Sequence, residues 1–164
     1  MLEIYVDGSA INNENPNIPS LGGVGVCVID NGDVEGYSVQ VPKDASLPNL
    51  DLGKITNNTT ELAAIYVALE VVITNYDEST PVIIYGDSQY AGNLVFGNWK
   101  PKENKEQVAK VKQLASKVPH VTWEYVKAHA DNQYNNYADY LAKSGAYKTP
   151  EREVLSFNEW LLNA

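Results

Sequence analysis

Two aspartates stand at the ends of segments that are typical of β-strands. Asp7 ends the alternating segment 2–7, and Asp87 follows the continuous apolar run 82–85. Functional sites of open α/β sheets gather at the carboxyl ends of strands, so the two carboxylates lie side by side if these strands are parallel neighbours. Carboxylates that close repel each other, and a divalent cation that favours hard oxygen ligands, Mg²⁺ or Mn²⁺, relieves the repulsion. The pair predicts a metal site, against the simpler interpretation that aspartate favours strand ends and turns.

Two further carboxylates lie on predicted helices, and a histidine follows a predicted strand. Glu61 shares a helical face with apolar residues such as Ile65, so we expect it to point toward the sheet, although a carboxylate there also suits the helix dipole. Asp139 lies inside a later helix, where an exposed carboxylate is the plain alternative. His129 follows the predicted strand 121–127, in a loop where a lone histidine usually has no special role.

Basic residues are concentrated in one part of the chain. Residues 100–117 hold six lysines against two glutamates, a net charge of +4. Because the whole chain has a net charge of −9, the remaining residues together carry −13. A polyanion would have one obvious place to bind there. The alternative is a solvated amphipathic helix.

The composition is that of one soluble domain of 164 residues, 44% of them hydrophobic. A net charge of −9 argues against a generic nucleic-acid binder, which is usually basic. No apolar run approaches the length of a membrane span, and the N-terminus lacks the pattern of a signal peptide. The single cysteine, Cys27, excludes an intramolecular disulfide and disfavours a cysteine-based zinc site. We therefore expect a cytoplasmic protein with no membrane association.

The strands that position these residues follow from alternation and turn signals. The second and third predicted strands flank Asn31-Gly32, which indicates an antiparallel hairpin. The segment 12–20 is rich in Asn and Pro, and a second polar segment with two prolines follows the hairpin; both are expected to be loops. The predicted strands are 2–7, 22–29, 34–41, 82–85 and 121–127, and the predicted loops are 12–20 and 42–56.

The clearest helix follows the second loop. Apolar residues from Leu62 to Ile73 recur on one helical face, and Asn58 is predicted to be the N-cap with Glu61 as its reciprocal partner. The order β-β-β-α-β-α-α-β-α predicts a mixed sheet with helices packed on it. Residues 1–146 are expected to form one domain and 147–164 a C-terminal extension. The other predicted helices are 88–95, 104–117, 134–146 and a short one at 157–162.

The ordered set of these motifs resembles type 1 ribonuclease H over roughly residues 2–146. Each string alone is weak, but all of them occur in the family's order, on the expected elements and at compatible spacing. The resemblance implies an α/β, RNase H-like mixed five-stranded sheet, its first three strands antiparallel and the rest parallel, with helices on both faces. The strings are Tyr5-Val6-Asp7-Gly8-Ser9, Thr56-Asn57-Asn58-Thr59-Thr60-Glu61-Leu62, Gly86-Asp87-Ser88-Gln89-Tyr90, Val126-Lys127-Ala128-His129 and Asn135-Asn136-Tyr137-Ala138-Asp139.

The resemblance also implies a reaction. Members of the family bind two Mg²⁺ ions, with Mn²⁺ as a possible substitute, and hydrolyse the RNA strand of RNA–DNA hybrids, leaving 5′-phosphate and 3′-hydroxyl ends. Asp7 would bridge the two metals, Glu61 and Asp87 would hold one, and Asp139 would hold the other. His129 matches the family's mobile-loop histidine, which would help proton movement or product release.

The resemblance further implies where substrate binds. The basic protrusion of well-studied members is reduced here to Trp99 and the lysines that follow it. We expect a monomer whose partner is the hybrid duplex. The positions that match hybrid contacts are Asn57, Asn58 and Gln89 for the minor groove, Thr56 for a DNA phosphate, and Lys100, Lys102 and Lys105 beside the duplex.

Three alternatives stay open on the sequence. The chain could be another enzyme of the same superfamily, such as a metal-dependent DNA nuclease or a strand-transferase. It could be a catalytically silent hybrid-binding module, although all four carboxylates are present. It could also be one piece of a larger polymerase or replication assembly, against our expectation of a free-standing protein.

Overall fold

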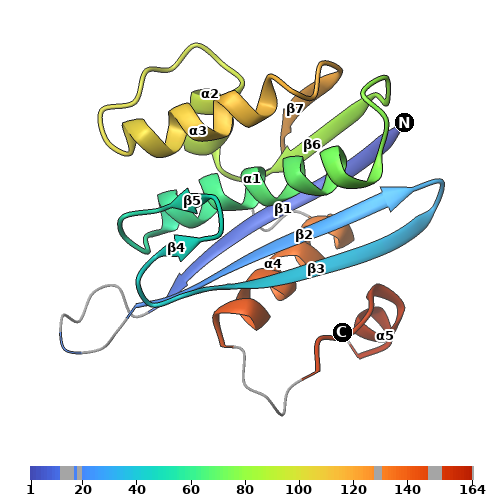
Figure 1. The fold of residues 1–164 in the computed structure, drawn as a ribbon. Coiled ribbons are helices and arrows are strands. Elements are labelled where there is room, and N and C mark those ends of the chain that lie inside the picture. Colours follow the sequence, from blue (N-terminus) through green and yellow to red (C-terminus); the bar gives the residue numbers. More distant parts are fainter. Residues whose placement is uncertain (12–16, 18–19, 128–130, 148–152, 164) are drawn as a thin grey trace.

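A mixed five-stranded sheet forms the centre of the computed structural model, which describes residues 1–11, 17, 20–127, 131–147 and 153–163 (Figure 1). The strand order is β3-β2-β1-β6-β7. The first three strands are antiparallel, and β6 and β7 continue the sheet parallel to β1, as predicted. The bounds are β1 (Leu2–Ile11), β2 (Leu21–Asp30), β3 (Asp33–Val41), β6 (Val82–Gly86) and β7 (Val121–Tyr125).

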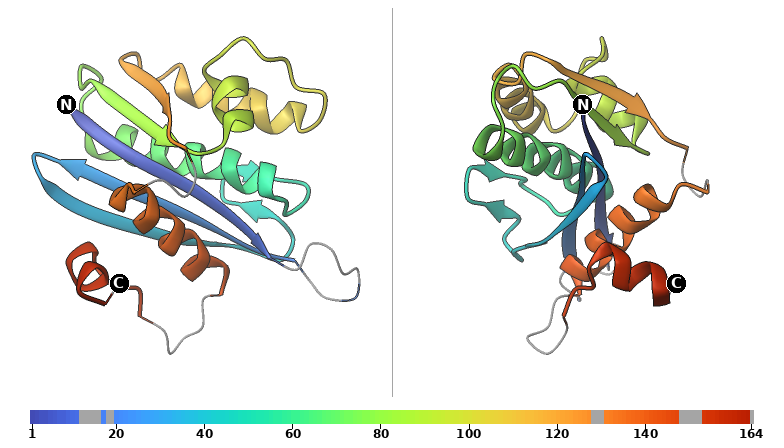
Figure 2. Two further views of the ribbon diagram at one scale, coloured as in Figure 1. Left: turned by 180° about the vertical axis from the view of Figure 1, so that it is seen from behind. Right: turned by 90° about the vertical axis from the view of Figure 1, so that its right-hand side faces the viewer.

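Helices cover both faces of this sheet, which confirms the second part of the predicted architecture (Figure 2). One face carries α1, α2 and α3, and the other carries α4 with α5 beside it. Strand side chains alternate between the faces, so Ile4 joins the core under α1 while Tyr5 joins the cluster under α4. The bounds are α1 (Asn57–Asn75), α2 (Gln89–Val95), α3 (Lys105–Ala115), α4 (Gln133–Ala146) and α5 (Phe157–Asn163).

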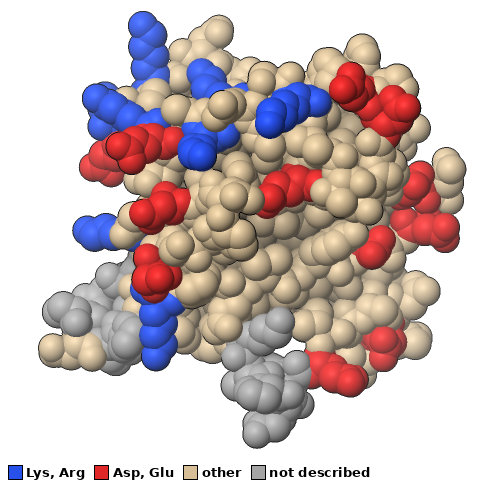
Figure 3. Space-filling model, in the orientation of Figure 1, with Lys and Arg blue, Asp and Glu red and all other residues tan. Residues whose placement is uncertain are grey.

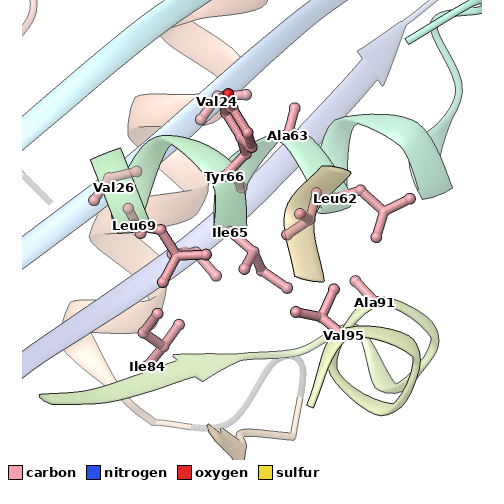
Figure 4. Close-up of a cluster of buried hydrophobic side chains, with 14 of the residues drawn as sticks. Val24, Val26, Leu62, Ala63, Ile65, Tyr66, Leu69, Ile84, Ala91 and Val95 are labelled. Carbon is pink, nitrogen blue, oxygen red and sulfur yellow. The ribbon is translucent and has the colours of Figure 1, made fainter. Parts of the chain in front are cut away.

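The larger core lies between α1 and the sheet. Ile65 and Leu69 of α1 point toward Ile84 of β6, and Val95 of α2 closes the same cluster (Figure 4). These side chains are almost completely buried. Removing apolar area of this size from water is the main contribution that fixes α1 on the sheet, and α1 carries Glu61.

The start of α1 differs from the prediction. The N-cap is Thr56, one residue before the helix: its Oγ1 accepts the N–H of Thr59 at 3.1 Å, and Thr59 Oγ1 accepts the N–H of Thr56 at 2.9 Å. The prediction of Asn58 as cap with Glu61 as partner is therefore wrong. Two threonines at cap spacing satisfy the first backbone donors, which leaves the Glu61 carboxylate for another partner.

The predicted loop 42–56 also contains more structure than expected. It holds a small antiparallel pair, β4 (Ser46–Leu47) and β5 (Leu50–Asp51), with Leu47, Leu50 and Leu52 buried. Two-residue strands are too short for alternation to reveal them. The predicted hairpin is confirmed, with Asn31 at φ 50° and Gly32 at φ 86°, the left-handed values of a tight β-hairpin turn.

The C-terminal segment packs against α4. Phe157 is buried and its ring meets Tyr137 edge-on at 5.3 Å between centroids. Tyr137 donates its hydroxyl proton to the carbonyl of Leu155 at 2.8 Å, and the Leu155 N–H donates to the Tyr140 hydroxyl at 2.9 Å. The short helix predicted at 157–162 is thus present as α5. Among the described residues, no helix has the length and apolar character needed to cross a bilayer.

Candidate active site

Three carboxylates meet where β1 and β6 run parallel. The register places Val6 beside Gly86, so Asp7 and Asp87 leave these positions at the same level of the sheet. Glu61 joins them from α1, and one carboxylate oxygen from each residue lies within 4.8 Å of the others. Asp7 is 5% exposed, while Glu61 and Asp87 are half-buried.

Glycine at position 8 allows Glu61 to reach this cluster. A Cβ at Gly8 would collide with the backbone of Thr60 and Glu61, so only glycine lets α1 lie this close to β1. The N–H of Gly8 donates to Glu61 Oε1 at 3.1 Å. The residue next to Asp7 therefore both admits the helix and orients its carboxylate.

The opposite helix approaches through a second glycine. Gly25 of β2 pairs with Asp7, and a Cβ on it would collide with the backbone of Ala138 and Ala142 in α4. This close packing places Asp139 beside Asp7, where a hydrogen bond between the two carboxyl groups contributes to the raised pKa of Asp7. Asp139 is not one of the three groups within 4.8 Å of one another, and it flanks them from α4.

A lysine accompanies Asp139. Lys143, one turn later on α4, lies 2.9 Å from Asp139 Oδ2 through its Nζ. The hydrogen bond and charge of Asp139 raise the pKa of Lys143, and the charge of Asp7 adds to this effect. The sequence interpretation missed this lysine, although its spacing of four residues from Asp139 is that of a helical ion pair.

The electrostatics of the cluster favour a bound cation. Burial, then the charges of Glu61 and Asp87, raises the pKa of Asp7 far above its usual range. Burial is also the largest cause of the raised pKa of Glu61, although its hydrogen bonds to Asp7 and to the Gly8 N–H act in the opposite direction. The three groups resist ionising together unless positive charge is added. Oxygen donors alone fit Mg²⁺ or Mn²⁺.

The residues predicted to touch substrate lie around this cluster at two helix N-termini. Asn57 and Asn58 open α1, and Gln89 opens α2; all three are exposed. Thr56 lines a depression of about 420 Å³ together with two lysines, Lys43 and Lys54, and one carboxylate, Asp44. The Thr56 hydroxyl also caps α1, so one side chain belongs both to the helix cap and to the wall of the depression.

The three predicted lysines lie at the start of α3. Lys100 and Lys102 precede this helix, Lys105 is its first residue, and all are exposed. Asn104, at φ 57°, donates a hydrogen bond from Nδ2 to the Tyr90 hydroxyl at 3.0 Å, which ties the segment to α2. Basic side chains gather over α3 and the loop before it in Figure 3, apart from most of the acidic ones on that face.

His129 lies outside the described residues, between Ala128 and Ala130, which are outside them as well. Asn135, the first residue of the string that ends at Asp139, was given no role from the sequence and lies one turn before Asp139. Asn135 is 4% exposed, and its Oδ1 has no hydrogen-bond partner in the described part of the chain. No simple sequence signal marks a buried asparagine of this kind.

Comparisons with known proteins agree with this architecture. Residues 1–147 match the family model described as RNase H. A protein of Prosthecochloris aestuarii named ribonuclease H is 34% identical over 157 residues, which cover 85% of this chain and 91% of that one. The structure of LC11-RNase H1 in complex with an RNA/DNA hybrid superimposes with a TM-score of 0.70 at 26% identity, covering 90% of this chain and 98% of that one. RNase H1 of Halobacterium salinarum has the same TM-score at 20% identity, covering 90% of this chain and 98% of that one, which supports the fold alone.

Proposed function

The chain belongs to the RNase H family, and from this membership we propose that it is an endoribonuclease that hydrolyses the RNA strand of RNA–DNA hybrids, leaving 5′-phosphate and 3′-hydroxyl ends. The observation that carries the proposal is the convergence of Asp7, Glu61 and Asp87 within 4.8 Å, in a chain whose family match spans residues 1–147. The relative solved with an RNA/DNA hybrid supports the choice of substrate.

The family's dependence on metal and the oxygen donors of the cluster support two divalent cations, Mg²⁺ with Mn²⁺ as a substitute. Asp7 would contact both, Glu61 and Asp87 one, and Asp139 the other. When bound, such ions supply the Lewis acidity that activates water and stabilises a leaving oxygen. The protein itself contributes the fixed carboxylates, with Glu61 oriented by the Gly8 N–H.

Around this centre, each remaining residue has a proposed role. Asn57, Asn58 and Gln89 have the donors and acceptors needed to sense 2′-hydroxyls and base edges in a wide minor groove. Thr56 would hold a DNA phosphate, supported by the two lysines of its depression. His129 would assist proton movement or product release. Lys100, Lys102 and Lys105 would lie beside the duplex as the electrostatic contact.

At the level of the chain, we propose residues 1–146 as the catalytic domain and 147–164 as a C-terminal extension, whose helix α5 packs on α4. A monomer suffices for this function, because the proposed site is built from one chain. A cytoplasmic location suits the one cysteine, Cys27, whose thiol is buried and free.

The test is digestion of one duplex labelled on either strand. We expect wild-type protein with Mg²⁺ to cut the RNA strand of an RNA–DNA hybrid, to spare its DNA strand, and to spare DNA duplex of the same sequence. The products should be ligatable 5′-phosphates. Cleavage of the DNA duplex at a similar rate would point to the DNA nuclease alternative, and binding without turnover would point to the silent module.

A further inference from the structure

In Figure 2, α5 lies beside α4 on the side of α4 that faces away from the sheet. Side chains of these two helices line a groove there. Its volume is about 520 Å³. We call it the α4–α5 groove. Its lining includes Asp139, Tyr140, Lys143, Tyr147 and Trp160.

The groove adjoins the candidate active site through Asp139. Asp139 lines it and also lies beside Asp7. Lys143 lines it while its Nζ lies 2.9 Å from the Asp139 carboxylate. A strand that leaves the carboxylate cluster on the side of Asp139 therefore meets the lining of the groove next.

The lining has the chemistry of a nucleotide site. Tyr147 is 47% exposed, and the rings of Tyr140 and Trp160 lie 6.2 Å apart between centroids. Aromatic faces stack with nucleobases of any sequence, and this is how single strands are held without base readout. Lys143 adds one cation at the end of the groove nearest the cluster, and lysine is a common phosphate contact.

One wall of the groove is formed by a residue that lies beyond the part of the chain matched by the family model. That match ends at residue 147, whereas Trp160 belongs to α5. Trp160 is held in place by Tyr137 at 5.3 Å and Phe157 at 6.1 Å between ring centroids. The extension thus contributes a fixed aromatic surface beside the site, from residues that the family model does not cover.

We propose that the α4–α5 groove binds an unpaired nucleotide of the RNA strand where that strand leaves the hybrid, with its base against Tyr147 and Trp160 and its phosphate toward Lys143. The proposal rests on the proposed function, since the RNA strand must pass Asp139. Binding in the groove would make hybrids with a single-stranded RNA extension better substrates than blunt hybrids.

The first experiment compares blunt hybrid with hybrids that carry three extra ribonucleotides at the 5′ or the 3′ end of the RNA. One polarity should lower KM by about five- to tenfold, as expected from stacking of one base, with kcat unchanged. Tyr147→Ala should abolish that preference and keep the blunt rate. Tyr125→Ala is the matched control, because Tyr125 is also a half-exposed tyrosine, at 46%, but pairs with Gly86 at the end of β7 and lies outside the lining of the groove. If neither polarity lowers KM, or if both variants behave alike, the groove proposal is wrong.

The second experiment does not depend on cleavage. A short single-stranded RNA that carries 2-aminopurine should lose fluorescence when it binds wild-type protein without divalent metal, because stacking on aromatic rings quenches this base. Tyr147→Ala should weaken that binding and Tyr125→Ala should not. Quenching without hybrid cleavage would refute the proposed function and keep the groove, whereas cleavage of blunt hybrid without Tyr147-dependent quenching would refute the groove alone.

Discussion

Gly8 is the residue on which the geometry of the carboxylate cluster most depends. Its missing side chain lets α1 lie against β1, and its N–H holds Glu61 Oε1 at 3.1 Å. The carboxylates themselves were predictable, since Asp7 and Asp87 lie at the ends of recognisable strands and all of them occur in the motifs shared with the family. The contact between Gly8 and Glu61 was not predictable from the sequence. The two residues are 53 positions apart, and their contact depends on how closely α1 packs against β1.

A first prediction concerns this contact. Gly8→Ala should lower the free energy of unfolding by about 1–3 kcal/mol, the usual cost of overpacking, and should slow Mg²⁺-dependent cleavage because Glu61 is pushed away from Asp7. Urea denaturation and initial rates measure the two effects. Gly32→Asn is the control, since a side chain there meets open space and asparagine tolerates its positive φ. Wild-type activity in Gly8→Ala would contradict the proposed role of the contact.

A second prediction follows from the raised pKa values of Asp7 and Glu61. A carboxyl whose pKa is higher in the folded than in the unfolded state stabilises the fold below its unfolded pKa, about 4, and loses that contribution as pH rises toward the folded value. Metal-free protein should therefore lose stability between about pH 4 and pH 8 through this site, and added Mg²⁺ should restore it.

Urea denaturation across this pH range in the presence of a chelator tests the point. Asp87→Asn should reduce the loss, because the change removes one of the repelling charges, and it should be more stable than wild type near pH 8. Asp33→Asn serves as control, because Asp33 is exposed at the start of β3, away from the cluster. If the two variants show the same pH dependence, repulsion within the cluster is not its source.

At the scale of elements, the sequence predicted which segments form strands and helices better than it predicted their ends. The long α1 and the β2–β3 hairpin carry strong periodic and turn signals and were found where expected. The cap of α1 was misplaced because asparagine at 58 and threonine at 56 are both good caps, and the reciprocal bond comes from Thr59 rather than from Glu61. The β4–β5 pair was missed because its stability comes from burial of Leu47 and Leu50 rather than from a local pattern.

The α1 cap gives a third prediction, because Thr56 is proposed to serve both the helix and a DNA phosphate. Thr56→Ala and Thr59→Ala each break the capping box and should each cost about 1 kcal/mol of stability. Of the two variants, only Thr56→Ala should also raise KM for the hybrid, since Thr56 lines the depression with Lys43 and Lys54 and Thr59 does not. Michaelis–Menten kinetics of both variants decide this: equal KM values would assign Thr56 to the helix alone.

At the scale of the whole molecule, the charges are divided. Residues 100–117 carry +4 and the remainder −13, and basic side chains gather around α3 (Figure 3). Long-range attraction to a polyanion is therefore unfavourable, and contact must act within about one Debye length, roughly 8–10 Å at working salt. Composition alone argued against a nucleic-acid partner; the local arrangement reverses that inference.

This division gives a fourth prediction. Neutralising Lys100, Lys102 and Lys105 to Gln together should raise KM and flatten its dependence on salt, because fewer counterions are released on binding. The turnover number should hardly change, since the lysines bind ground and transition states alike. The control replaces Lys110, Lys112 and Lys117 with Gln, which removes the same charge farther along the segment. Identical salt slopes for both triple variants and wild type would show that the first three lysines do not bind substrate.

Metal-dependent cleavage of the RNA strand is proposed to occur at the cluster of Asp7, Glu61 and Asp87, and the decisive measurement is the rate of hybrid cleavage by Asp87→Asn. The amide keeps the shape of the side chain and removes the charge that would hold the cation. We predict that cleavage with Mg²⁺ falls to the metal-free background while circular dichroism shows an intact fold, and that Asp33→Asn cleaves at the wild-type rate. Retained Mg²⁺-dependent turnover in purified Asp87→Asn would show that this cluster is not the site of cleavage.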